Sequence, residues 1–207
     1  MVYDYTIKVY DKMLTKNEKK VIRTLLFSFG EEYSINEIAR KCNLAPNGAL
    51  KILKKFAEEG IIILKKIANI NSYLVDFANS KTRSILELSL IDEANSKVKN
   101  RVEDLKELQK ITEAAVIFGS YITEKENPED IDLFFVLEKE NFRKYKEETK
   151  KIYPPMPVKV HDILQTIEDL EKNISKKDKV ILEILRKGFI LWGQDKIIEA
   201  IKNGHGN

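Results

Sequence analysis

The chain has 207 residues, of which 43% are apolar and 33% are charged, with a formal net charge of +3 and one cysteine. This composition excludes an intrinsically disordered chain and an internal disulfide, and the small net charge permits nucleic-acid binding without requiring it. The sequence contains no apolar run typical of a membrane span or a signal peptide, so we expect a cytoplasmic protein that does not contact membranes.

The first part of the chain shows helical spacing followed by two β-rich runs. Thr15 and Ser34 are each followed three residues later by a glutamate, which is the capping-box pattern that begins a helix. Apolar residues then recur at intervals of three and four, and Gly30 and Gly60 follow two of these segments as stop signals. The pattern predicts helices at 15–30, 34–42 and 46–59 and strands at 61–64 and 73–77.

This order of elements resembles a winged helix-turn-helix domain over roughly residues 14–77. The resemblance implies binding of double-stranded DNA, with the start of the third helix in the major groove. Basic side chains of this region would contact phosphates, whereas the alternative role for such a domain is protein docking or dimerisation. The residues that we expect to bind DNA are Arg40, Lys41, Asn47, Lys51, Lys54, Lys55, Lys65 and Lys66.

A segment from about residue 82 to 111 carries apolar residues at intervals of three and four, which predicts one long helix. At about 1.5 Å per residue it would span roughly 40 Å, with Asn95, Ser96 and Asn100 as candidate interruptions. Such a stripe either packs on the chain's own domains or forms a dimer seam. We favour a homodimer through this linker helix, because DNA-reading modules usually act as two-fold pairs.

After this helix the pattern changes to apolar runs of β type that alternate with amphipathic segments. These predict strands at 114–118, 130–137, 157–164 and 189–193 and helices at 141–153, 167–187 (with a break near 172–176) and 194–202. Alternation along a strand places Asp130 and Asp132 on one face, with Ile131 buried on the other. Adjacent carboxylates repel unless a cation lies between them, and Mg²⁺ prefers carboxylates together with substrate phosphates. The sequence therefore predicts a magnesium site suited to phosphoryl or nucleotidyl transfer, beside a phosphate-binding turn at Gly119 and Ser120.

The motif Gly119-Ser120-Tyr121, followed after a short gap by DIDLFFV from Asp130, resembles the signature of the DNA polymerase β-like nucleotidyltransferase superfamily. It is most similar to the minimal nucleotidyltransferases of archaea and bacteria, over about residues 105–203. The resemblance implies a Gly-Ser pair that binds nucleotide phosphates, two aspartates that hold metal, and a third acid on a neighbouring strand. The residues expected in these roles are Asp130, Asp132 and Asp162 as catalytic groups, Asp130 and Asp132 as metal ligands, and Gly119, Ser120, Tyr121 and Lys125 as nucleotide-binding groups.

Neighbouring residues decide what such a site would do. Asp162 is the expected general base or second metal ligand, whereas His161 points to the opposite face of its strand and is interpreted as a partly buried histidine. Glu124, Glu126 and Glu129 add negative charge where a triphosphate would lie. An inactive domain retained as a sensor or scaffold is therefore a second hypothesis, since fold and activity are separate properties.

Together these patterns predict an α+β chain of two domains: a winged helix-turn-helix in residues 1–79, a long linker helix in 80–110, and a nucleotidyltransferase-type mixed β-sheet flanked by helices in 111–207. The favoured function is DNA binding, as in a transcription regulator, combined with Mg²⁺-dependent binding of NTP and transfer of NMP to an unknown acceptor. The alternatives are a catalytically inactive regulator and an antitoxin-like nucleotidyltransferase that acts on a separate helical protein.

Overall fold

The computed structural model divides the chain into two compact units, Met1–Asp92 and Glu93–Asn207, each with its own buried core. It describes residues 14–67, 70–97, 99–123 and 128–204. The division falls inside the segment 80–110 that the sequence predicts as a linker. Within the described ranges, no helix combines the length and the apolar character that crossing a membrane requires.

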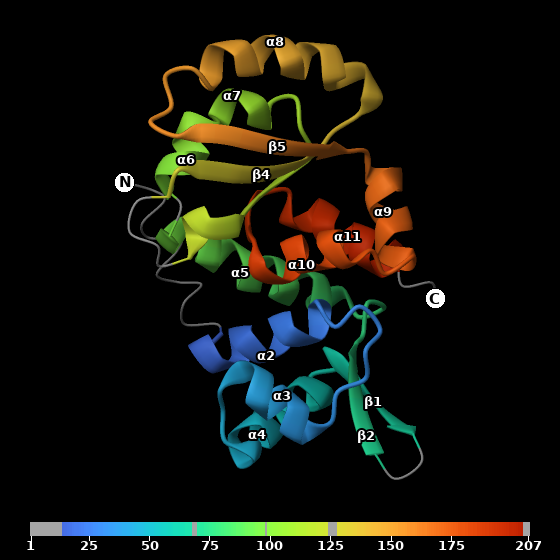
Figure 1. Ribbon diagram of the computed structural model, residues 1–207. Helices are drawn as coiled ribbons and strands as arrows, with labels where there is room; N and C mark the ends of the chain where they lie inside the picture. The colour runs from blue at the N-terminus through green and yellow to red at the C-terminus, as the bar shows by residue number, and fades with distance from the viewer. Residues whose placement is uncertain (1–13, 68–69, 98, 124–127, 205–207) are drawn as a thin grey trace. The chain divides into compact units, whose positions relative to one another are not determined.

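Three helices and a hairpin form most of the first unit (Figure 1). The helices are α2 (Lys16–Leu26), α3 (Ile35–Cys42) and α4 (Pro46–Glu58), and the hairpin pairs β1 (Ile62–Ile67) antiparallel with β2 (Ile70–Val75). Both predicted capping boxes form, because the Thr15 and Ser34 hydroxyls and the glutamates three residues later exchange hydrogen bonds with each other's backbone N–H groups. The predicted order of elements is confirmed, whereas the identification of this unit as a winged helix-turn-helix stays a prediction.

An apolar core and a largely buried carboxylate hold the first unit together. Side chains of α2, α3 and α4 are buried between the helices, among them Ile22 and Phe56. The Lys55 ammonium donates a hydrogen bond of 2.7 Å to Glu18 Oε1, which joins α4 to the start of α2. Although burial acts to raise the pKa of Glu18, the hydrogen bonds from Lys55 and Thr15 outweigh it and hold that pKa below its ordinary value.

The segment that follows the hairpin is not one long helix. It forms α5 (Ser80–Lys97), α6 (Lys99–Asp104) and α7 (Lys106–Gln109), with Leu105 in a non-helical conformation between the last two. Leu105 and Leu108, which belong to the apolar stripe of the sequence, are fully buried in the core of the second unit. The break at Leu105 lies beyond the candidate interruptions at Asn95, Ser96 and Asn100, so the predicted helix is shorter than expected. Because Leu105 and Leu108 pack into the core of the second unit, neither is available to a dimer seam.

A mixed four-stranded sheet forms the centre of the second unit. Its strands are β3 (Ala114–Phe118), β4 (Asp130–Val136), β5 (Lys159–Gln165) and β6 (Phe189–Trp192), in the spatial order β5-β4-β3-β6. β3 pairs antiparallel with β4 and β6, while β4 pairs parallel with β5 across a connection that contains α8 (Phe142–Ile152). The sheet carries α8 on one side and, on the other, α9 (Ile167–Ser175), α10 (Lys179–Lys187) and α11 (Gln194–Gly204), as Figure 1 shows. The predicted mixed sheet flanked by helices is confirmed.

A left-handed residue divides the predicted helix 167–187 into α9 and α10. Lys177 has a φ of +55°, and the Asp178 carboxylate then caps α10 by accepting the backbone N–H groups of Val180 and Ile181 at 3.0 and 3.1 Å. The sequence indicates a break near 172–176, and the structure places it slightly later, at residues 176–178.

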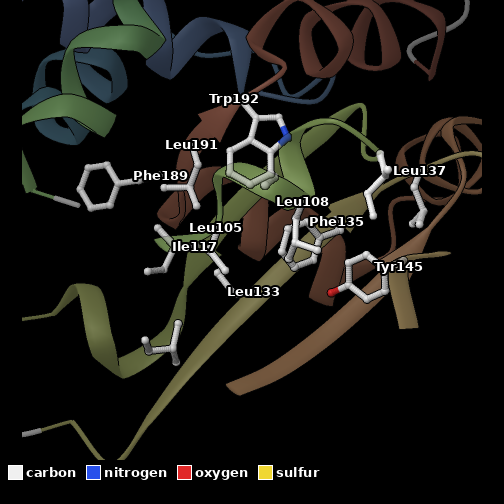
Figure 2. Packing of buried hydrophobic residues seen from close by; sticks show 13 residues of the cluster. Leu105, Leu108, Ile117, Leu133, Phe135, Leu137, Tyr145, Phe189, Leu191 and Trp192 are labelled. Carbon is white, nitrogen blue, oxygen red and sulfur yellow. The ribbon is translucent and has the colours of Figure 1, made fainter. Parts of the chain in front are cut away.

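The α8 side of the sheet is a closed aromatic and aliphatic core (Figure 2). The Phe135 ring lies 5.3 Å from the Tyr145 ring in an edge-on arrangement and 6.0 Å from the Trp192 ring. The Trp192 indole N–H donates a hydrogen bond of 3.1 Å to Thr112 Oγ1, so its one polar atom is satisfied inside the core. With this face filled by apolar residues of β4, the polar residues Asp130 and Asp132 of that strand are directed to the opposite face.

Candidate functional site

Two aspartates of β4 face away from the packed core. Ile131 and Leu133 are fully buried on the α8 side of the sheet. Because side chains alternate along a strand, Asp130 and Asp132 point to the side that carries α9, α10 and α11. The structure thus places the predicted pair on one face, at the start of a strand whose other face is fixed by the core.

The strand register brings a histidine to these carboxylates. Asp132 pairs with Phe118 on β3 and with His161 on β5, and paired residues share a face of the sheet. The His161 Nδ1 atom lies 3.5 Å from Asp130 Oδ2 and 3.7 Å from Asp132 Oδ1. The three side chains are 48% (His161), 36% (Asp130) and 28% (Asp132) exposed, so the cluster is open to ligands from solvent.

This cluster has the composition and the spacing of a divalent-metal site. Ligand atoms of Asp130, Asp132 and His161 all lie within 4.8 Å of one another. Metal–ligand bonds of about 2.0–2.2 Å place neighbouring ligand atoms roughly 3–3.5 Å apart around an ion, which is close to the separations from His161 Nδ1 to the carboxylate oxygens. The three residues therefore fit a divalent cation, and two of them are the predicted ligands.

The turn after β3 is built closely around one of the carboxylates. Gly119 has a φ of +76°, and a Cβ at this position would lie 2.1 Å from Asp132 Oδ2. Glycine adopts this left-handed conformation without strain, and because it lacks a Cβ it does not clash with the Asp132 carboxylate. Residues Gly119–Ile122 then form a 3₁₀ turn, in which Ser120 Oγ donates a hydrogen bond of 3.5 Å to Asp130 Oδ1. The structure thus brings the Gly-Ser turn and the aspartate pair together.

Asp162 does not join this cluster. It lies on the opposite face of β5, where the hydroxyls of Tyr145 and Tyr153 donate hydrogen bonds of 2.7 and 3.0 Å to Asp162 Oδ2. Burial raises the pKa of both tyrosines, and the neighbouring carboxylate raises them further. The expected placement of Asp162 with the pair is therefore wrong, because the parallel register turns His161 towards Asp132 and Asp162 towards α8.

The turn also lies beside a cation that sequence reasoning missed. The ring of Tyr121, predicted to contact nucleotide, lies 5.9 Å from the guanidinium carbon of Arg101 on α6. Arg101 pairs with Asp104 Oδ2 at 2.9 Å, and its buried Nε makes no hydrogen bond in the part of the chain that the structure describes. No sequence motif marks Arg101 as a site residue, because it lies in the segment 80–110 whose pattern predicts a linker helix. The predicted Lys125 lies outside the described residues.

A pocket of about 640 Å³ adjoins the Gly-Ser turn. Gly119 and Phe118 form part of its wall, and Phe118 shares a face of the sheet with Asp132, so the pocket and the metal cluster lie on the same side. No sequence pattern marks this pocket, because its wall is assembled from two separate segments of the chain, residues 118–123 and 180–189. It is lined by Phe118, Gly119, Ile122, Thr123, Val180, Glu183, Ile184, Lys187 and Phe189.

The residues predicted to bind DNA fall into two groups in the first unit. Lys51 and Lys54 are exposed on α4, on the side away from its buried residues. Lys55 is instead paired with the buried Glu18, and Lys65 pairs with a glutamate at 3.2 Å, so both neutralise charge within the unit. The other predicted residues are also exposed; these are Arg40, Lys41, Asn47 and Lys66.

Comparison with known proteins bears on the second unit. No curated protein matches the chain. Residues 99–187 match the family model described as "Polymerase beta, Nucleotidyltransferase". The matched segment contains the Gly-Ser turn, the aspartate pair and His161, which are the groups that the sheet register assembles into one site. Motif, geometry and family match therefore agree, and they support assigning residues 99–187 to the nucleotidyltransferase superfamily.

Proposed function

We propose that the second unit binds a nucleoside triphosphate with a divalent cation and transfers its nucleoside monophosphate to an acceptor hydroxyl. The contact of Gly119 with Asp132 carries this proposal, because it fixes the phosphate-binding turn of β3 against the acidic pair of β4. The family match supports the same reaction class. In this reaction the acceptor hydroxyl releases its proton to solvent and its oxygen bonds to the α-phosphorus, while the bond from that phosphorus to the bridging oxygen breaks and pyrophosphate leaves.

The residues of this site would act by position and charge. Asp130 and Asp132 would hold the cation, which when bound neutralises phosphate charge and orients the triphosphate. Ser120 Oγ and the backbone N–H groups of the turn would donate hydrogen bonds to phosphate oxygens. The adjoining pocket has the volume expected for a small-molecule site, and its Phe118 and Phe189 rings offer a surface on which a base could pack.

Calorimetric titration with ATP, GTP, CTP and UTP, with and without Mg²⁺ or Mn²⁺, tests nucleotide binding. We expect cation-dependent binding by the wild type and its loss in the double variant Asp130→Asn/Asp132→Asn, because the cation loses both carboxylates. Asp162→Asn is the matched control, since it removes a carboxylate from the opposite face of β5 and should leave binding unchanged. Equal binding by the double variant and the wild type would contradict the proposal, as would no binding at all.

Transfer needs a separate measurement, because binding alone does not distinguish an enzyme from a sensor. A cell extract supplies candidate acceptors for NTP labelled at the α-phosphate. We expect label to enter macromolecules with the wild type and not with Asp130→Asn/Asp132→Asn. Nucleotide binding without any incorporation would favour the catalytically inactive alternative.

We also infer that the first unit binds double-stranded DNA through α4. Ala49, Leu53 and Phe56 are buried on one side of this helix, which leaves Lys51 and Lys54 exposed on the other. Two cations one helical turn apart can contact adjacent backbone phosphates. Because Lys55 pairs with Glu18, we assign it a structural role. The proposed DNA contacts are therefore those of Lys51 and Lys54.

Fluorescence anisotropy of a labelled duplex at stepped salt concentrations tests this interface. We expect Lys51→Glu/Lys54→Glu to weaken binding about tenfold or more and to reduce the salt slope by about two, one unit for each lost phosphate contact. The control Lys146→Glu/Lys150→Glu makes the same charge change on exposed positions of α8. Equal weakening by both double variants would indicate general attraction to the protein's charge and would overturn the assignment of α4.

A further inference from the structure

We propose that His161 is a third protein ligand of the divalent cation and that it directs the site towards Mn²⁺ and Co²⁺ over Mg²⁺. Because this role builds on the proposed function, it applies to the cation that Asp130 and Asp132 would hold. It concerns which metal is preferred, a property that the binding of nucleotide does not by itself reveal.

His161 is held in this position by its neighbours on both sides along β5. Val160 packs against the core on the α8 side, and Asp162 accepts hydrogen bonds from two tyrosine hydroxyls on that same side. Parallel pairing with β4 then places His161 directly beside Asp132. A rotation of the strand that removed His161 from the cluster would break these contacts, so β5 presents His161 on the face of the carboxylates before any ligand arrives.

The distances leave room for an ion between the imidazole and both carboxylates. His161 Nδ1 lies 3.5 Å from an Asp130 oxygen and 3.7 Å from an Asp132 oxygen, which is close to the separation of neighbouring ligand atoms around one ion. The His161 side chain is 48% exposed, so a hydrated ion can reach it. The other side of the cluster is closed by Gly119, against which the Asp132 carboxylate packs.

The chemistry of the ligand atoms sets the preference. Mg²⁺ is a hard ion that favours oxygen ligands and keeps most of its water, whereas imidazole nitrogen suits first-row transition metals. Two carboxylates and an imidazole also carry one negative charge less than three carboxylates would. Electrostatic attraction to Mg²⁺, which gains little from the imidazole nitrogen, is therefore weaker at this site. Both effects disfavour Mg²⁺ relative to Mn²⁺ and Co²⁺ at this site.

A competing explanation makes the opposite prediction. A protonated His161 would pair with the two carboxylates and occupy the place of the cation. Replacement of His161 by alanine would then free the carboxylates and tighten metal binding. If His161 is a ligand, the same replacement weakens binding of Mn²⁺, so the sign of the change separates the two roles.

The experiment titrates the full chain with MnCl₂ in the absence of nucleotide, using the electron paramagnetic resonance signal of free Mn²⁺, and with MgCl₂ as a competitor. Variants are His161→Ala, His161→Asp and, as control, His205→Gln, which changes the chain's other histidine. We expect His161→Ala to weaken Mn²⁺ about tenfold or more with a smaller change for Mg²⁺, and His161→Asp to reduce the Mn²⁺ preference by a similar factor. With CoCl₂, we expect hyperfine-shifted imidazole N–H resonances that His161→Ala removes and His205→Gln retains.

The outcomes distinguish this role from the proposed function. Unchanged or tighter Mn²⁺ binding in His161→Ala would overturn the ligand role, and nucleotide binding that still depends on Asp130 and Asp132 would leave the proposed function intact. Absence of both metal and nucleotide binding in the wild type would overturn both. Because His161 is half exposed, its variants should retain the wild-type circular dichroism spectrum, and this measurement identifies any variant that fails to fold.

Discussion

At the scale of single residues, Gly119 is the position where the site tolerates least change. Its φ of +76° costs a residue with a side chain backbone strain, and an added Cβ would lie 2.1 Å from Asp132 Oδ2. The carboxylate would have to move away from its position in the Asp130–Asp132–His161 cluster. One methyl group at Gly119 would therefore disturb both the Gly-Ser turn and the proposed metal ligand.

We expect Gly119→Ala to lower the free energy of unfolding by about 1–2 kcal/mol and to weaken Mn²⁺ binding at the same time. Urea unfolding and the Mn²⁺ titration measure the two effects. The control is Gly48→Ala, where an added Cβ meets nothing within 4 Å and lies in α4, so a gain of about 0.5–1 kcal/mol is expected from helix propensity. Wild-type metal affinity in Gly119→Ala would show that the contact with Asp132 does not set the site.

His161 and Asp162 show how far sequence reasoning reaches at this scale. Alternation along a strand correctly predicts that one of them faces the acidic pair and the other faces away. Which one does so depends on the register between β4 and β5, and a step of one residue exchanges their faces. That register is set by the α8 crossover and by the tyrosines that bind Asp162, and neither constraint can be read from β5 itself.

At the scale of elements, local sequence signals predict where a helix begins better than where it ends. The capping boxes at Thr15 and Ser34 and the proline at the start of α4 fix where three helices begin, because these signals act within one turn. The break at Leu105 has no such local cause. It follows from burial of Leu105 and Leu108 in the second core, a tertiary effect that overrides an otherwise helical pattern.

The contact between α2 and α4 makes the first unit sensitive to acid. The pKa of Glu18 is lowered in the folded chain, so the carboxylate stabilises the fold above its ordinary value of 4.5, and this stabilisation is lost as pH falls through the lowered value. We expect stability to fall more steeply below about pH 4.5 in the wild type than in Glu18→Gln, as measured by far-ultraviolet circular dichroism. Identical pH profiles would contradict this role.

Replacement of the partner tests the same contact at neutral pH. Lys55→Met should lower the free energy of unfolding by about 1–3 kcal/mol, because it leaves the Glu18 carboxylate largely buried without its strongest donor. The neighbouring Lys54→Met alters an exposed lysine of the same helix and should change stability by no more than about 0.5 kcal/mol.

At the scale of the whole molecule, each candidate site draws its residues from one unit. The Gly-Ser turn, the aspartates and His161 lie in the second unit, while Lys51 and Lys54 lie in the first. Shared residues therefore cannot couple the sites, and any coupling would need a change in conformation that both ligands favour differently. The sequence predicts the existence of two domains, because the hydrophobic pattern changes near residue 111.

We expect Asp130→Asn/Asp132→Asn to leave DNA affinity within about twofold of the wild type, and Lys51→Glu/Lys54→Glu to do the same for nucleotide affinity. Anisotropy and calorimetry under the same buffer conditions measure the two affinities. A change in DNA affinity on adding NTP and Mn²⁺ would instead reveal linkage, and DNA would then have to change nucleotide affinity by the same factor.

Trp192 gives the chain a built-in optical reporter. It is the single tryptophan of the sequence, and its indole is buried beside Phe135 in the second unit. Its emission spectrum therefore follows the melting of that unit alone, whereas the helical signal in circular dichroism sums over both. The difference between the two melting curves isolates the first unit, so the effects of Glu18 and Gly119 variants can be assigned to their own halves of the molecule without labels.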